Sequence, residues 1–75
     1  MKALTDAQKS SIVEKKIFWE HGDRLDKVAS REYGDPTYWW VIARYNKKPT
    51  DAHFKRGDVV LVPSPIRLIV AYYTE

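Results

Sequence analysis

Turn-forming residues divide this chain at short intervals, and their positions constrain the fold more than any other feature of the sequence. Turn signals lie at residues 21–23, 34–36 and 57–58, and Pro49 and Pro63 add further stops. Glycine and proline interrupt helices and strands because of their special backbone conformations, and proline also lacks an N–H donor. A chain of 75 residues without cysteine must therefore build one small core from short segments, without a disulfide or a thiolate zinc site.

The central segments predict an α+β domain with the order strand, helix, helix, strand. Residues 17–20 and 59–62 are short β-prone runs. Between them, apolar residues recur at helical spacing in two sets, first Leu25, Val28, Ala29 and Tyr33, then Tyr38, Trp39, Ile42, Ala43 and Tyr45. Asp23 and Asp35 precede the two sets and are the expected N-cap residues, because a short carboxylate accepts hydrogen bonds from the free amides of a first helical turn.

The expected domain covers residues 17–63 and leaves an attachment at each end. Residues 1–16 are polar and predict an N-terminal arm with one short helix, started by a Thr5-x-x-Gln8 capping box. Residues 64–75 contain a β-branched and aromatic run and predict an extra C-terminal β-strand. This strand either extends the domain's own sheet or completes the surface of another subunit. The second interpretation is favoured because two strands and two helices already account for a core of this size.

The aromatic content is high and points to contacts with a partner. Three Trp, five Tyr and two Phe make up 13% of the chain, and large rings left partly at a surface usually lie at interfaces. Trp40 and Arg44 lie off the apolar face of the second expected helix, so they either pack under a terminal segment or contact a partner. The residues expected to bind a partner are Trp40, Arg44, Ile66, Leu68, Val70, Tyr72 and Tyr73.

The order and spacing of several short motifs resemble the lysin motif (LysM) domain. These motifs are Gly22-Asp23-Arg24-Leu25, Val28-Ala29-x-x-x-Tyr33-Gly34, Ile42-x-x-x-Asn46 and Gly57-Asp58-x-x-Leu61-Val62-Pro63. The resemblance covers residues 17–63 and implies a βααβ fold, which agrees with the order of elements predicted from periodicity.

Residues 33–43 are similar to a particular branch of this family. The run Tyr-Gly-Asp-Pro-Thr-Tyr-Trp-Trp resembles the version found in small tail and baseplate proteins of bacteriophages. The resemblance implies a structural protein of a contractile phage tail, made in the host cytoplasm and located in the virion. It would act as a multi-copy assembly module that joins neighbouring baseplate proteins.

Binding of peptidoglycan or chitin is the alternative function that a LysM resemblance implies. A shallow sugar slot would lie between the loop after the first strand and the loop before the second. Its residues here would be Gly22, Asp23, Arg24, Pro49, Thr50 and Asp51. Arg24 stands where the sugar-binding branch usually has Thr or Ser, and residues 47–56 are rich in charge, so long basic side chains would crowd N-acetyl groups.

Other classes of function lack candidate residues in the sequence. We predict no enzyme and no cofactor, because there is no nucleophile elbow, no Gly-rich phosphate loop and little room for a cleft. No metal site is predicted from His21 and His53, which have no cysteine partner. The net charge of +3 is spread along the chain, which disfavours nucleic acid. No run approaches the ~18 apolar residues of a membrane span, so no membrane partner is expected.

Overall fold

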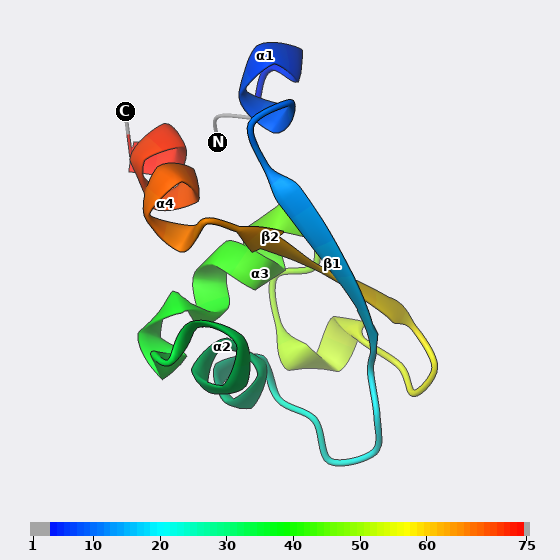
Figure 1. Cartoon of the computed structure of the whole chain (residues 1–75). Helices are drawn as coiled ribbons and strands as arrows, with labels where there is room; N and C mark the ends of the chain where they lie inside the picture. Colours follow the sequence, from blue (N-terminus) through cyan, green and yellow to red (C-terminus); the bar gives the residue numbers. More distant parts are fainter. Residues whose placement is uncertain (1–3, 75) are drawn as a thin grey trace.

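A two-stranded antiparallel sheet packed against helices organises the structure, a computed structural model that describes residues 4–74 (Figure 1). The elements are α1 (Asp6–Lys9), β1 (Val13–Phe18), α2 (Leu25–Tyr33), the 3₁₀ turn η1 (Pro36–Tyr38), α3 (Trp39–Tyr45), the 3₁₀ turn η2 (Asp51–His53), β2 (Val59–Ser64) and α4 (Ile66–Thr74). Within the described residues this is a small mixed fold of four α-helices and one sheet, compatible with the expected α+β class.

Strand β1 pairs with β2 over its whole length, from Val13 opposite Ser64 to Phe18 opposite Val59. It therefore begins four residues earlier than the expected strand at residues 17–20, and it crosses the expected boundary between arm and domain at residue 17. Its first four residues are exposed and mostly charged. A strand forms there because pairing uses the main chain, and the outward face of an antiparallel sheet tolerates polar side chains.

The core lies between the sheet, α2 and α3. Its buried members are Trp19, Leu25, Val28, Ala29, Ile42, Ala43, Phe54, Val60 and Val62. The helical spacing of the first set, Leu25, Val28 and Ala29, is confirmed by their burial in α2. Trp19 and Phe54, from the two long connections, stack at 4.6 Å between ring centroids and close the core on the side of the loops.

Local signals at the helix ends are partly confirmed. Gly34 ends α2 in the left-handed conformation, with φ of 75°, and the side chain of Asp35 accepts from the Thr37 amide at the start of η1. Asp23 does not cap α2: its carboxylate accepts from the Glu20 amide at 2.7 Å and closes a turn. The first amide of α2 instead donates to Asp51, 26 residues further along the chain.

The expected C-terminal β-strand is wrong, because these residues form helix α4. A third strand beside β2 would need free main-chain groups on its outer edge. Those groups are occupied: the Pro63 carbonyl accepts from the Tyr33 hydroxyl, and the Leu61 N–H and C=O both bond to the Asn46 side chain. Apolar residues at 66, 69, 70 and 73 have helical spacing, and Ile69 becomes fully buried.

The terminal elements lie at the same end of the molecule, with α1 and α4 at the top of Figure 1 and the loop from β1 to α2 at the bottom. The capping box of α1 is confirmed, since Thr5 and Gln8 bond to each other's amides. No residue of α1 is buried. Residues 1–3 of the expected arm, and Glu75 at the end of the expected C-terminal segment, lie outside the described residues.

Candidate functional site

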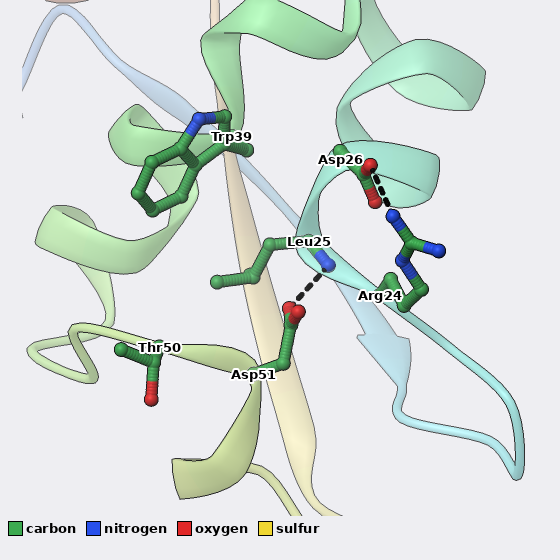
Figure 2. A pocket seen from close by; sticks show the side chains of 6 residues that line it. All are labelled: Arg24, Leu25, Asp26, Trp39, Thr50 and Asp51. Carbon is green, nitrogen blue, oxygen red and sulfur yellow. Dashed lines mark hydrogen bonds and ion pairs between the residues drawn. The ribbon is translucent and has the colours of Figure 1, made fainter.

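An open pocket lies where the connections after β1 and before β2 approach the first residues of α2 and α3. Its volume is about 310 Å³. Figure 2 shows the residues that line it, which are Arg24, Leu25, Asp26, Trp39, Thr50 and Asp51. The fold builds this pocket by the long-range cap described above: the Asp51 carboxylate accepts from the Leu25 amide at 2.6 Å and holds η2 against the start of α2.

The pocket combines an apolar wall with a polar rim. Trp39 is 42% exposed and contributes one side, and Leu25 lies between it and Asp51 in Figure 2. The Thr50 hydroxyl is within 2.9 Å of His53 Nδ1, which orients it. A half-exposed indole beside hydroxyl and carboxylate groups suits a ligand with one apolar face and several hydroxyls, because the ring covers the face and the polar groups bond to the rim.

Three of the six residues expected for a sugar slot line this pocket, namely Arg24, Thr50 and Asp51. Gly22 and Asp23 instead form the turn before α2, and Pro49 is exposed beside Thr50. The Arg24 guanidinium is paired with Asp26 at 2.9 Å, and in Figure 2 it lies away from Trp39 and Thr50. It therefore does not fill the space between Trp39 and Asp51.

The sequence prediction missed Trp39, which it assigned to the buried face of the second helix. Trp39 lies three and four residues before Ile42 and Ala43 within α3, so it does lie on the same side of the helix as these two residues. It is the first residue of the helix, however, and lies beside the open pocket, so 42% of it stays exposed. Periodicity predicts the side of a helix on which a residue lies, but it does not reveal how far along that side the core extends.

Trp40 and Arg44 pack against the C-terminal helix. The rings of Trp40 and Tyr73 lie 6.1 Å apart, and the Arg44 guanidinium carbon lies 4.1 Å from the centroid of the Tyr73 ring. The structure thus follows the interpretation in which Trp40 packs under the C-terminal segment. All three side chains are half-buried, and their binding to a partner stays a prediction.

Helix α4 has an apolar arc wider than the part that the domain buries. At 100° per residue, the apolar side chains extend over about 200° of the helix. Ile69 is fully buried at the centre of this arc. The flanks, which remain half-buried, carry Ile66, Leu68, Val70, Tyr72 and Tyr73. These are five of the seven residues expected to bind a partner, so the structure brings them together with Trp40 and Arg44 on and beside one helix.

Several side chains outside the pocket have shifted pKa values with structural causes. A hydrogen bond from Lys15 lowers the pKa of Glu32, against the opposing effect of burial. The Lys55 amide and the Lys48 ammonium lower the pKa of Asp58. Burial raises the pKa of Tyr33 and of Tyr45, whose hydroxyl also donates to Glu14. These contacts tie the sheet and loops to the helices.

No family model matches this chain, and no curated protein or solved structure matches it. None of the helices within residues 4–74 is long and apolar enough to cross a membrane. In the same residues, no group of three His, Asp or Glu side chains is placed to hold a metal ion.

Proposed function

We propose that this protein is a structural module of a contractile bacteriophage tail. In this proposal a LysM-like domain, present in several copies, joins neighbouring baseplate proteins in the virion. The observation that supports it most is α4, whose apolar arc is about twice as wide as the ~100° stripe that a surface helix needs for packing on its own domain.

The roles of the motif residues in this chain support a LysM-like arrangement. Gly34 ends the first core helix, and Asn46 connects the end of the second helix to β2 through two bonds with Leu61. Strand, helix, helix and strand follow one another between residues 13 and 64. Helices α1 and α4 then stand outside this unit, at the same end of the molecule in Figure 1.

Burial of the α4 flanks would supply the binding free energy. Complete burial of an exposed Leu, Val or Tyr side chain is worth roughly 1.5–3 kcal/mol. Leu68, Val70 and Tyr72 are already partly buried, so each has at most about a third of this left to gain. Aromatic side chains at such positions are frequent centres of interfaces.

Capture of tail proteins tests the proposal. The tagged protein is incubated with the tail and baseplate proteins of the phage that encodes it, and bound proteins are identified by mass spectrometry. Leu68→Asp should reduce capture at least about tenfold, because it places a charge in an apolar interface. Ser30→Asp, which adds the same charge to the exposed face of α2, should leave capture unchanged. Circular dichroism verifies that both variants fold. The proposal is wrong if no tail protein is captured, or if both variants bind like the original.

A second candidate function is binding of peptidoglycan or chitin in the pocket, and the exposed Trp39 ring favours it. Sedimentation with cell-wall sacculi and with chitin tests this function. Trp39→Ala should reduce retention at least about tenfold, whereas Leu68→Asp should not. Absence of retention of the original protein at moderate salt would remove this candidate and leave the assembly proposal untouched.

A further inference from the structure

The main chain of β1 has an open outer edge. The Trp19 amide donates to the Asp58 carbonyl, and the Trp19 carbonyl accepts from Gly57, each at 2.8 Å, so residue 19 directs its main-chain groups toward β2. Directions alternate along an antiparallel strand. Residues 13, 15 and 17 therefore face β2, while Glu14, Lys16 and Phe18 direct their N–H and C=O groups away from it.

The outer edge of β2, by contrast, is covered at Leu61 and Pro63. Leu61, opposite Lys16 in the register, donates to Asn46 Oδ1 at 2.9 Å and accepts from Asn46 Nδ2 at 2.8 Å. Pro63, opposite Glu14, has no N–H, and its carbonyl accepts from Tyr33 at 2.6 Å. Across residues 4–74, no side chain or loop forms a hydrogen bond with the outward main-chain groups of Glu14, Lys16 or Phe18. An uncovered edge is a template for another strand.

We propose that the outer edge of β1 pairs antiparallel with the same edge of a second copy, about a two-fold axis at Lys15. In this register Glu14 of each copy lies opposite Lys16 of the second copy. The two pairs of opposite charge are adjacent to the main-chain bonds that Glu14 and Lys16 make across the interface. The two sheets become one four-stranded sheet. This inference does not depend on the proposed function.

Charge selects this register from the few that geometry allows. Only residues 14, 16 and 18 have outward main-chain groups, so these must meet one another across the two-fold axis. An axis at residue 14 places Glu14 opposite Glu14 of the second copy, and an axis at residue 16 places Lys16 opposite Lys16 of the second copy. An axis at residue 17 places Lys16 opposite Phe18, without attraction between charges. An axis at residue 18 leaves one outward pair, because the main chain of Glu20 is already bonded to Asp23. Like charges directly opposite destabilise a sheet, whereas opposite charges stabilise it. The axis at Lys15 gives two favourable pairs and is the register that we infer.

The side chain of Glu14 has room for a second partner. One of its carboxylate oxygens accepts from the Tyr45 hydroxyl of the same copy. A carboxylate has two oxygens and accepts several hydrogen bonds, so the other oxygen can meet Lys16 of the second copy. Glu14 and Lys16 are both exposed, so neither side chain has to leave a buried position to form this pair.

The other face of the strand is compatible with this pairing. Val13, which is 68% exposed, would lie opposite the half-buried Ile17 of the second copy, giving two apolar pairs. The two Lys15 side chains would meet at the axis, and each already has an ion pair at 2.9 Å with Glu32 of its own copy. This internal pairing offsets their mutual repulsion.

Charge exchange between copies tests the proposal. Sedimentation equilibrium over a concentration series should show a monomer–dimer equilibrium for the original protein. Glu14→Lys and Lys16→Glu alone should each raise the dimer dissociation constant at least about tenfold, because two attractive pairs become repulsive. A mixture of the two variants should dimerise again, since the lysines at positions 14 and 16 of one chain then meet the glutamates at positions 16 and 14 of the other. The control Lys27→Glu, on the exposed side of α2, should dimerise like the original.

Hydrogen exchange gives a readout that needs no substitution. The amides of Glu14 and Lys16 should become protected as the protein concentration rises, while the Leu61 amide is protected at every concentration. A protein that stays monomeric at its highest soluble concentration overturns the proposal. So does a dimer that both single variants form equally well, or a mixture that does not recover dimerisation. Protection of Glu14 and Lys16 only upon addition of a different protein would assign the edge to a foreign strand and would also overturn it.

Discussion

At the scale of single residues, Asn46 does more for the fold than its half-buried position suggests. Its amide donates to the Ile42 and Leu61 carbonyls and its oxygen accepts from the Leu61 amide. One side chain thus satisfies the end of α3 and the outer edge of β2. Buried main-chain groups without a hydrogen-bond partner destabilise the folded state. Asn46 supplies these partners between helix and sheet, where water would otherwise have to supply them.

Asn46→Ala should lower the free energy of unfolding by about 2 kcal/mol, because three hydrogen bonds are lost and half-buried main-chain groups remain. Urea denaturation followed by circular dichroism measures this. Ser30→Ala, on the exposed face of α2, should change it by less than about 0.5 kcal/mol. Equal values for the two variants would contradict the assigned role of Asn46.

Glu32 gives the fold a dependence on pH. The Lys15 hydrogen bond holds its pKa below the ordinary value of 4.5, so the ionised carboxylate stabilises the folded state. This contribution is fully present above pH 4.5 and is lost as the pH falls through the folded-state pKa.

Glu32→Gln should therefore lower stability at pH 7, by less than about 1 kcal/mol because Lys15 is exposed to solvent. The difference between this variant and the original protein should shrink toward about pH 3. Urea titrations at both pH values test this expectation. A difference that is constant with pH would show that the ion pair does not contribute.

At the scale of elements, the parts that could be predicted from the sequence are those decided by neighbours in the chain. The first core helix, its Gly34 stop and the capping box of α1 depend on residues within about four positions of each other. Two other elements depend on β2, which is distant in the sequence. The start of β1 forms because it pairs with the main chain of β2. The C-terminal run is a helix and not a third strand, because Asn46 already bonds to the other edge of β2 at Leu61.

The candidate site shows the same division. Arg24, Thr50 and Asp51 were placed in the pocket by the order of motifs, whereas the exposure of Trp39 depends on where the core ends along α3, which periodicity does not reveal. Asp23 was the expected partner of the first α2 amide, but Asp51 takes this role. Local sequence could not predict this, because η2 and the start of α2 meet only in the folded chain.

Helix α4 should contribute to stability through one residue above all. Ile69 is fully buried, so Ile69→Ala should cost roughly 2–5 kcal/mol. Val70→Ala, at the half-buried flank of the same helix, should cost less than about 1.5 kcal/mol. Thermal and urea denaturation of both variants test this contrast. Similar losses for the two would indicate that α4 is not seated through Ile69.

At the scale of the whole molecule, a body of 34 × 21 × 21 Å carries three separate surfaces on a small core. Adjacent tryptophans at the start of α3 serve two of them: Trp39 lines the pocket, and Trp40 lies against Tyr73 of α4. The third surface is the β1 edge. A single core of this size rarely supplies more than about 3–5 kcal/mol, so association would form a large share of the total stability.

The midpoint of thermal unfolding should therefore rise with protein concentration, because a dimer of folded chains is favoured by mass action. Glu14→Lys should show a midpoint that depends less on concentration than that of the original protein. Differential scanning calorimetry over a hundredfold range of concentration measures both. A constant midpoint for the original protein would contradict stabilisation by a second copy.

The outer edge of β1 is open and the outer edge of β2 is bonded to side chains, and this difference limits the number of chains that can associate. A strand pair that uses the same edge in both copies closes on itself, and each outer strand of the resulting sheet is β2. In β2 the outward main-chain groups of Leu61 and Pro63 are already bonded to Asn46 and Tyr33. Growth therefore stops at two chains. Removal of Asn46 would open a second template in each copy, so the same contact that closes a dimer would then permit an open-ended fibre.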